Sequence, residues 1–302
     1  MVIIYFIFAV YSNIGEVAKS LVAMNLILLP LILLSFTIAV VIKGIRQYYL
    51  LKYNDIRISF KENLIVYIAG LSLIFTPGGI GGMVKVKLLK DSHQVSIKKT
   101  AAVVIMELYH EFFSWVTLII VTLFFYNYIE AKIALIFGIV ILVAIYMNFR
   151  YHRFLEIFKK LVTKLKFLQK MLEGDEDTRK SLYVLTQPSL MVKIWIITCI
   201  STIFEAIAIY LIFLSLGVKQ LSIILQLQVY YTALLFGQIT FLPNGIGLTD
   251  VSLIGMLVAR KLDLALATSV VLLIRIIGIW FKTGIGLVAL KSLQRKDNAK
   301  AS

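Results

Sequence analysis

The 302-residue sequence contains little cysteine, proline and charge. Its single cysteine, Cys199, cannot form an internal disulfide bond, so cysteine usage does not indicate the redox compartment. Charged residues make up 16% of the chain, against roughly a quarter in soluble domains. Only four prolines accompany 60% hydrophobic residues, a composition that excludes a disordered chain. Acidic residues are fewer than basic ones, 16 against 31, which gives a net charge of +15. Together with a mean hydropathy of +0.93, this charge indicates a membrane protein rather than a nucleic-acid-binding protein.

Recognisable catalytic and cofactor motifs are also missing. The sequence has no Gly-x-Ser-x-Gly, Walker, His-Glu-x-x-His or paired-cysteine zinc motif. Glu107-Leu-Tyr-His110 has the spacing of half a di-iron site, but such bundles need two of these motifs and further glutamates. Residues Gly284–Ala289 match the dinucleotide pattern only inside an apolar stretch, which indicates close helix packing instead. We therefore expect no enzyme, no metal ion and no cofactor.

The basic residues gather in four stretches between apolar segments. Together these stretches hold 24 of the 31 lysines and arginines. The positive-inside rule places all four in the cytoplasm, with the C-terminus, and predicts a multi-pass protein of the cell (plasma) membrane. The stretches are residues 43–61, 85–99, 150–193 and 291–302.

This placement determines the topology of the segment between the first two basic stretches. Residues 62–84 must enter the membrane and return on the same side, and residues 77–82 (Pro-Gly-Gly-Ile-Gly-Gly) lie in their middle, which predicts a re-entrant helical hairpin. Residues 75–81 match residues 241–247 at five of seven positions, and a second hairpin, about 223–259, would be entered from the opposite side. We therefore predict an all-α polytopic membrane protein with two halves of inverted topology. The alternative, that both loops are ordinary turns between full spans, stays open.

The predicted organisation is a single transmembrane domain over residues 1–302. The first half covers about 24–149 and the second about 194–290, separated by a cytoplasmic basic amphipathic segment, 150–193, and followed by a basic tail, 291–302. Within the middle segment, aromatic and leucine side chains recur every three or four positions among lysines and arginines, as in a helix that lies on an anionic leaflet.

Several ionisable residues fall inside the predicted spans. Such groups are costly in a bilayer, so each is a functional candidate. Their placement suggests two paired networks, and structural neutralisation of the charges is an equally good interpretation. The first network would join Glu107 and Glu111 to Arg46 and Lys85; the second would join Glu205 and Asp250 to Arg275 and Lys282.

The two glycine-rich loops suggest a site for an anion. A helix that begins at membrane depth directs unpaired N–H groups and the positive end of its dipole into the loop, and glycines allow the backbone to approach a phosphate closely. A lipid headgroup is the phosphate available at that depth. The candidate lipid-phosphate-binding residues are Arg46, Pro77, Gly78, Gly79, Gly81, Lys85, Pro243, Gly245, Gly247 and Arg275.

The order of these motifs resembles the flippase-like superfamily, the transmembrane region of lysylphosphatidylglycerol synthases. The loop from Pro77, with Lys85 and a Leu-Leu pair after it, is similar to the family's Pro-Gly-Arg-Ile-Gly-Glu loop, although Gly82 replaces the usual glutamate. Residues 103–111 (Val-Val-Ile-Met-Glu-Leu-Tyr-His-Glu) resemble its Val-Val-x-Glu-Arg-x-x-Asp helix, and residues 243–250 resemble its Pro-Gly-Gly-Ile-Gly-x-x-Glu loop. Arg275 and Arg46 fall where the family has further arginines.

The resemblance implies a protein that moves or handles anionic, aminoacylated or polyprenyl-linked lipids between leaflets. In this view Glu107, Glu111, Glu205 and Asp250 hold the bases or meet a cationic headgroup. The sequence ends shortly after its last apolar stretch, so we expect no lipid synthesis by an aminoacyl-transferase domain. Expected partners are anionic membrane lipids and no nucleic acid; a homodimer and a separate lipid-modifying enzyme stay open, as do a proton- or ion-coupled solute transporter and an accessory subunit or enzyme of glycolipid assembly.

Overall fold

The computed structural model describes residues 14–74, 81–150, 176–238, 245 and 247–301, and every regular element among them is helical. The predicted all-α membrane architecture is thereby confirmed at this level: five helices are long and apolar enough to cross a membrane. They cover Leu26–Tyr53, Ile97–Leu123, Ile129–Arg150, Pro188–Ser215 and Leu264–Gln294. The helices run in the order α2 (Ile14–Val22), η1 (Leu26–Leu28), α3 (Leu29–Tyr53), α4 (Phe60–Gly70), η2 (Leu71–Leu73), α5 (Gly81–His93), α6 (Ile97–Leu123), α7 (Ile129–Arg150), α10 (Glu176–Leu185), α11 (Pro188–Ser215), α12 (Ile223–Gln238), α13 (Leu248–Ala259), α14 (Leu264–Leu273), η6 (Ile274–Trp280) and α15 (Phe281–Ala301).

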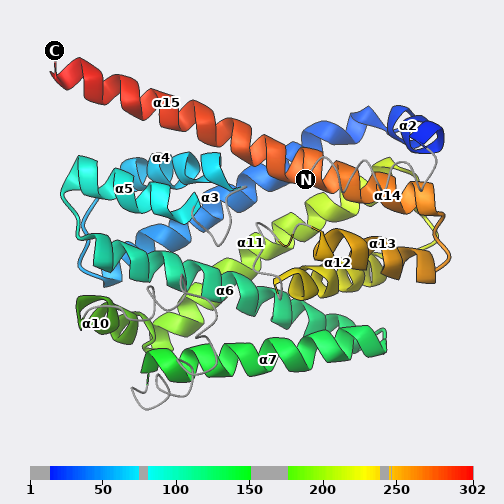
Figure 1. The fold of residues 1–302 in the computed structure, drawn as a ribbon, viewed down its shortest axis with the longest axis horizontal. Coiled ribbons are helices and arrows are strands. Elements are labelled where there is room, and N and C mark those ends of the chain that lie inside the picture. Colours follow the sequence, from blue (N-terminus) through cyan, green and yellow to red (C-terminus); the bar gives the residue numbers. More distant parts are fainter. Residues whose placement is uncertain (1–13, 75–80, 151–175, 239–244, 246, 302) are drawn as a thin grey trace.

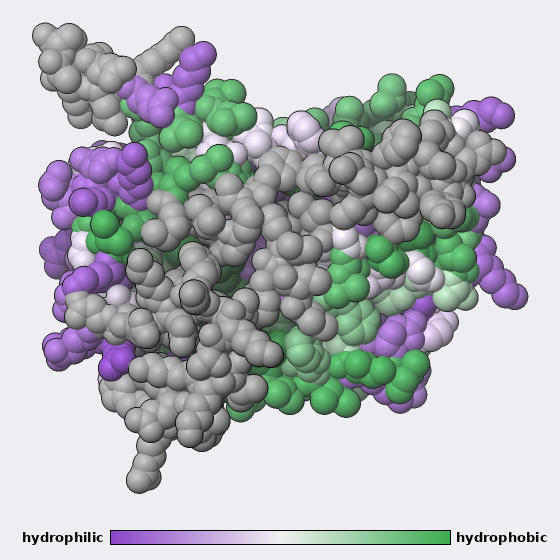
Figure 2. Space-filling view, in the orientation of Figure 1, coloured by the Kyte–Doolittle hydropathy of each residue, from purple (hydrophilic) through white to green (hydrophobic). Residues whose placement is uncertain are grey.

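The long helices lie roughly along the long axis of the molecule (Figure 1). Hydrophilic side chains gather at the two ends of that axis, and most of the coloured surface visible between them is hydrophobic (Figure 2). Polar ends separated by an apolar band fit the headgroup and hydrocarbon layers of a bilayer.

Local sequence signals determine where several helices begin. Pro30 and Pro188 lie in the first turns of α3 and α11, where a missing N–H costs no hydrogen bond. Ser59 and Glu62 form a reciprocal capping box at the start of α4. The Asp263 carboxylate accepts hydrogen bonds from two backbone N–H groups of α14.

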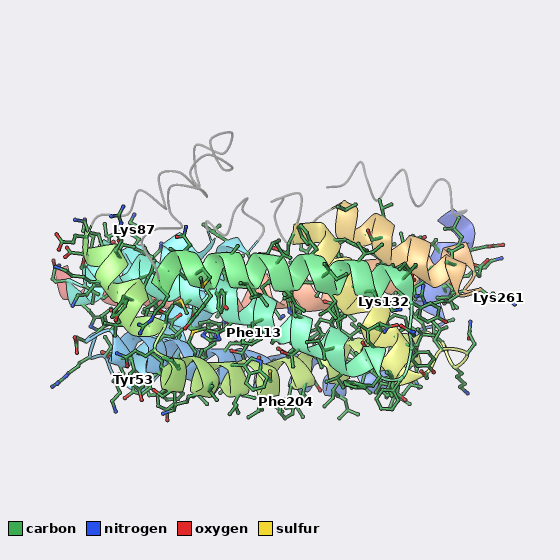
Figure 3. All side chains as sticks on the ribbon, turned by 90° about the horizontal axis from the view of Figure 1, so that it is seen from below. Tyr53, Lys87, Phe113, Lys132, Phe204 and Lys261 are labelled. Atoms are coloured by element: carbon green, nitrogen blue, oxygen red, sulfur yellow. The ribbon has the colours of Figure 1, made fainter. Side chains whose placement is uncertain are left out.

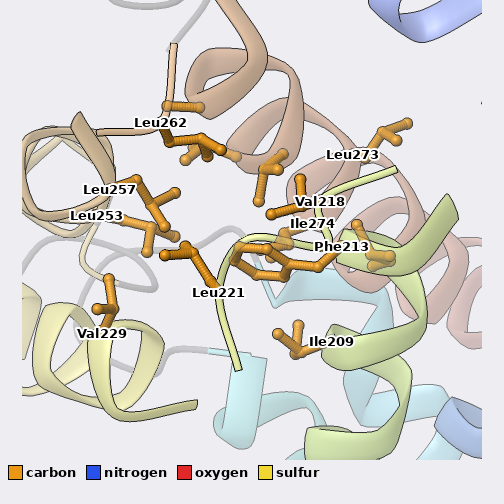
Figure 4. Packing of buried hydrophobic residues seen from close by; sticks show 14 of the residues in the cluster. Ile209, Phe213, Val218, Leu221, Val229, Leu253, Leu257, Leu262, Leu273 and Ile274 are labelled. Carbon is orange, nitrogen blue, oxygen red and sulfur yellow. The ribbon is translucent and has the colours of Figure 1, made fainter. Parts of the chain in front are cut away.

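Two clusters of buried apolar residues hold the helices together. One joins α11 to α12, α13 and α14 around Phe213, as Figure 4 shows. The other surrounds α6 and includes Met106 and Ile119, which are fully buried. Helix α3 packs along α11 between the two clusters, so these helices link the N-terminal and C-terminal parts of the chain.

Two pairs of short helices lie toward opposite ends of the molecule (Figure 1). Helix α4 packs on α5. Asn54 precedes α4 and Lys99 follows α5, and Asn54 Nδ2 donates a hydrogen bond to the Lys99 carbonyl at 2.9 Å. Helix α12 packs on α13, and Gln228 of α12 donates to the carbonyl of Tyr126 at 2.7 Å. The segments that connect the two helices of each pair lie mostly outside the described residues.

The structure gives helix limits that differ from the ends of the predicted segments. Helix α3 continues to Tyr53, so residues 43–53 of the first basic stretch belong to a helix that is long and apolar enough to cross a membrane. Lys193, assigned to the cytoplasmic segment, lies within α11, and the basic tail continues as helix α15 to Ala301. No proline occurs between Ile42 and Tyr53, so nothing in the sequence requires α3 to end at Ile42. Most of the predicted amphipathic segment, residues 151–175, lies outside the described residues.

Close packing at Gly286 brings α15 against η2. A Cβ atom added to Gly286 would lie 2.4 Å from the backbone nitrogen of Ser72, whereas one added to Gly284 would meet nothing within 4 Å. The helix-packing interpretation of this glycine motif is therefore confirmed at Gly286. Just before it, residues Ile274–Trp280 are π-helical, a wider winding that is frequent at functional sites.

Candidate functional site: a buried network of ion pairs

The first buried ion pair joins Lys85 of α5 to Glu107 of α6. Only 8% of Lys85 and 3% of Glu107 is exposed. The lysine stem crosses Gly70, where a Cβ atom would lie 2.3 Å from Cγ of Lys85, and its ammonium lies 4.9 Å from the centre of the Tyr67 ring. Gly70 therefore makes room for the lysine, and Tyr67 supplies a cation–π contact.

A central cluster joins four helices. Glu111 of α6 accepts hydrogen bonds from Lys43 and Arg46 of α3, the latter at 2.9 Å. Glu205 of α11 accepts from the same Lys43 at 2.9 Å and from Lys282 of α15 at 2.6 Å. Lys43 therefore connects an acid of the first half to an acid of the second.

The sequence of α3 explains why these bases face inward together. Lys43, Arg46 and Gln47 are three and four positions apart, which places them on one helical face. Gln47 Nε2 donates to Asn63 Oδ1 at 3.1 Å, and Asn63 Nδ2 donates to the Gly44 carbonyl at 2.8 Å. The polar face of α3 thus attaches α4 and presents its bases to α6 and α11.

The third group lies in the second half. Arg275 Nε donates to Asp250 Oδ1 at 2.8 Å, and Asp250 Oδ2 accepts from the Gly247 N–H at 3.0 Å. Asp250 therefore caps its own helix, α13, and holds the arginine of the π-helical segment. Gly245 and Gly247 have φ of +64° and +92°, a backbone conformation that glycine adopts without strain.

Bases exceed acids in this buried network. Among the residues that the structure describes, five bases face four acids, because Lys43 shares both of its acids with another base. The surplus lies in the central cluster, where three bases share Glu111 and Glu205; the other two pairs are neutral. A charge excess between apolar helices is costly, so the cluster favours an anion beside it.

The predicted pairing of acids and bases is confirmed in the described residues. Glu107 meets Lys85, Glu111 meets Arg46, Glu205 meets Lys282 and Asp250 meets Arg275. Lys43 was missed as a network residue, although Arg46 of the same basic stretch was included; its spacing of three from Arg46 was the available signal. Pro77, Gly78, Gly79 and Pro243 lie outside the described residues, and Gly81 begins α5.

His110 adds a buried polar side chain to the same helix. It is fully buried, and neither ring nitrogen has a hydrogen-bond partner among the described residues. Its neighbour in the Glu-x-x-His motif, Glu107, binds Lys85 rather than contributing to a ligand set. Within the described part of the chain, no group of three or more His, Cys, Asp or Glu residues is arranged to hold a metal ion.

Comparison with known proteins identifies the family. Residues 1–286 match the family model described as the lysylphosphatidylglycerol synthase TM region. A UPF0104 membrane protein of Methanothermobacter thermautotrophicus is 33% identical over 95 residues, which are 32% of this chain and 28% of that protein. The aligned part is thus less than a third of either protein. Because the family model covers nearly the whole chain, the protein belongs to the lysylphosphatidylglycerol synthase TM-region family.

Proposed function

We propose that this membrane protein moves or handles an anionic phospholipid or polyprenyl-linked lipid between leaflets, without catalysing a reaction. The observation that carries the proposal is the surplus positive charge of the central cluster in the described part of the chain, where Lys43, Arg46 and Lys282 share two carboxylates. A lipid phosphate has the charge that would balance it. Lysine and arginine are also the residues that bind phosphate through charge-assisted hydrogen bonds.

The exposure of the cluster supports access for such a headgroup. The side chains of Glu111 and Glu205 are 16% and 13% exposed, whereas those of Glu107 and Asp250 are 4% and 1% exposed. The exposed fractions of the bases differ less: Lys43 10%, Arg46 4% and Lys282 15% in the cluster, Lys85 10% and Arg275 9% in the two pairs. The less buried carboxylates support access of a headgroup to the cluster rather than to the two pairs.

The proposal includes two re-entrant hairpins of opposite direction. Helices α4 and α12 have 11 and 16 residues, fewer than the roughly 20 needed to span a bilayer. The hydrogen bond from Asn54, before α4, to the carbonyl of Lys99, after α5, supports an arrangement in which the first hairpin begins and ends on the same side of the membrane. The ion pair of Arg260, just after α13, with Glu130 supports an arrangement in which the second hairpin ends on the opposite side. In this arrangement the C-terminus is cytoplasmic and the headgroup moves between the two hairpins.

The experiment is leaflet-resolved lipid movement in proteoliposomes. Fluorescent phosphatidylglycerol and phosphatidylcholine are compared by dithionite bleaching, and the wild type is expected to move the anionic lipid faster. Lys43→Gln removes the surplus charge and should slow movement of phosphatidylglycerol by at least about tenfold, the worth of one charge-assisted hydrogen bond. Lys43→Arg keeps the charge and should retain movement, and Lys87→Gln, at an exposed lysine of α5, is the matched control.

Two results would contradict the proposal. If the wild type moves neither lipid, nor a polyprenyl phosphate, the function is wrong. If Lys43→Gln moves phosphatidylglycerol as fast as the wild type does, the surplus charge does not recognise the headgroup.

One observation favours the alternative of a proton-coupled solute transporter. His110 is a buried group that can take up a proton, and its ring nitrogens lack partners among the described residues. In vesicles loaded with a pH-sensitive dye, this alternative predicts a proton flux that His110→Gln abolishes. A flux in vesicles that move no lipid would favour it over lipid transport, and the absence of any flux would remove it.

A further inference from the structure

An open cavity lies where α3 ends and α11 begins, and it is lined by residues other than those of the central cluster. Its volume is about 210 Å³, and it is lined by Tyr49, Lys52, Tyr53 and Lys193. Three of these residues are three and four positions apart on the last turns of α3, so they share one face. Helix α11 packs along α3 and supplies the fourth. The cavity is therefore built by a helix–helix contact and not by a loop.

The tyrosines hold one lysine in place. The Lys193 ammonium lies 4.0 Å from the centre of the Tyr49 ring and 5.8 Å from that of Tyr53. Cation–π contacts of this kind restrict a side chain that would otherwise sample many rotamers. A restricted cation binds an anion with a smaller entropy cost than a free one.

Neither lysine of the cavity is neutralised by a carboxylate in the described part of the chain. The ion pairs found there involve other lysines and arginines. Lys52 and Lys193 are also both exposed. Two unneutralised cations that face one cavity favour an anionic ligand.

A stripe of apolar residues continues from the cavity along α11. Val192, Ile196, Ile200 and Ile203 are between 44% and 54% exposed, and their spacing of four, four and three places them on one face. Figure 3 places Tyr53 and Phe204 of α11 along the same edge of the molecule. An acyl chain can lie along this stripe while the headgroup stays at the cavity. The combination suits a lipid better than free phosphate.

We propose that the cavity of Tyr49, Lys52, Tyr53 and Lys193 binds the phosphate of an anionic phospholipid, with an acyl chain along the apolar stripe of α11. Tyrosine rings at the end of a membrane helix lie at headgroup level, which is the depth of that phosphate. The site does not depend on the proposed transport, because it lies at a helix end outside the buried ion-pair network.

Native mass spectrometry of the full-length protein tests this site. The protein is exposed in detergent to phosphatidylglycerol, phosphatidylcholine or inorganic phosphate at equal concentrations. Phosphatidylglycerol is expected to bind more tightly than the other two. Each lysine near an anionic headgroup contributes about fivefold in affinity, so Lys52→Gln combined with Lys193→Gln should raise the Kd of phosphatidylglycerol by roughly 30-fold.

A matched control separates the site from general positive charge. Lys87 and Lys90 are exposed lysines of α5, and Figure 3 places Lys87 at the same end of the molecule as Tyr53. Lys87→Gln combined with Lys90→Gln should leave the Kd unchanged, and Lys193→Arg, which preserves the cation on the tyrosines, should retain binding. An equal loss in the two double variants would overturn the proposal, as would equal affinity for phosphatidylcholine or binding of inorganic phosphate without the lipid. Lipid movement is measured separately in proteoliposomes, so failure of the transport proposal is distinguishable from failure of this site.

Discussion

Removing one member of a buried ion pair should destabilise the protein more than removing both. Lys85→Met leaves the Glu107 carboxylate buried, and its Oε1 atom already lacks a hydrogen-bond partner among the described residues. Breaking a buried pair costs about 3 to 5 kcal/mol, and a lone acid at the centre of a membrane helix costs about 2.5 to 3.5 kcal/mol. These ranges overlap, and we expect Lys85→Met to lower the free energy of unfolding by about 3 kcal/mol.

Removing the acid of the pair instead of the base should lower the free energy of unfolding somewhat less. Glu107→Gln leaves the Lys85 ammonium buried, but that ammonium keeps its contact with the Tyr67 ring, worth about 1 kcal/mol. We therefore expect a loss of about 2 kcal/mol. The double variant, Lys85→Met with Glu107→Gln, contains neither charge and should fall within about 1 kcal/mol of the wild type.

The assay is unfolding by SDS in mixed micelles, followed by circular dichroism, for the four members of the cycle. The expected losses of about 3 and 2 kcal/mol for the single variants, and of at most about 1 kcal/mol for the double variant, give a coupling energy of about 4 kcal/mol. Lys98→Gln provides the control, because Lys98 faces Asp177 at 3.9 Å with 47% and 60% of the two side chains exposed; it should change the unfolding free energy by less than about 0.5 kcal/mol. If the double variant is as unstable as Lys85→Met, the instability of Lys85→Met does not come from an uncompensated Glu107 carboxylate. That result would refute the account of the pair.

Two further predictions concern stability. Lys43→Gln should cost only about 1 to 2 kcal/mol in the same titration, because each acid that Lys43 contacts keeps a second base; a larger loss than that of Lys85→Met would contradict this. Gly286→Ala should lower the unfolding free energy by about 1 to 3 kcal/mol, since its Cβ would lie 2.4 Å from the Ser72 backbone nitrogen. Gly284→Ala, where nothing lies within 4 Å, is the matched control and should be neutral or slightly stabilising; equal effects would contradict the close packing at Gly286.

The sequence predicts the ion pairs well because intramembrane charges have few alternatives. An acid such as Asp250 inside an apolar helix needs a base, and Arg275 is one of the few in the second half that are not in a basic stretch. Helical spacing then places Glu107 and Glu111 on one face, toward the bases of neighbouring helices.

The sequence predicts the limits of the membrane spans less well. A run of lysines and arginines indicates the cytoplasmic side, but it does not mark the residue at which a helix leaves the membrane. In the sequence, Lys43 belongs to such a run of basic residues. In the structure it lies between helices, where two carboxylates from distant parts of the chain bind it. Only the packing of α3 against α6 and α11 reveals this, because the partners are 68 and 162 residues away. The same tertiary contact of α3 and α11 creates the cavity lined by Lys52 and Lys193, and no local sequence motif predicts that cavity.

The central claim is that the surplus charge of the cluster around Lys43 receives a lipid anion. The most direct measurement is a cryo-EM structure of the wild type in nanodiscs that contain phosphatidylglycerol. We predict density for a lipid phosphate within hydrogen-bonding distance of Lys43, Arg46 or Lys282, and loss of that density in Lys43→Gln. A well-ordered cluster without such density, with lipid phosphates bound only at the outer surface, would contradict the claim.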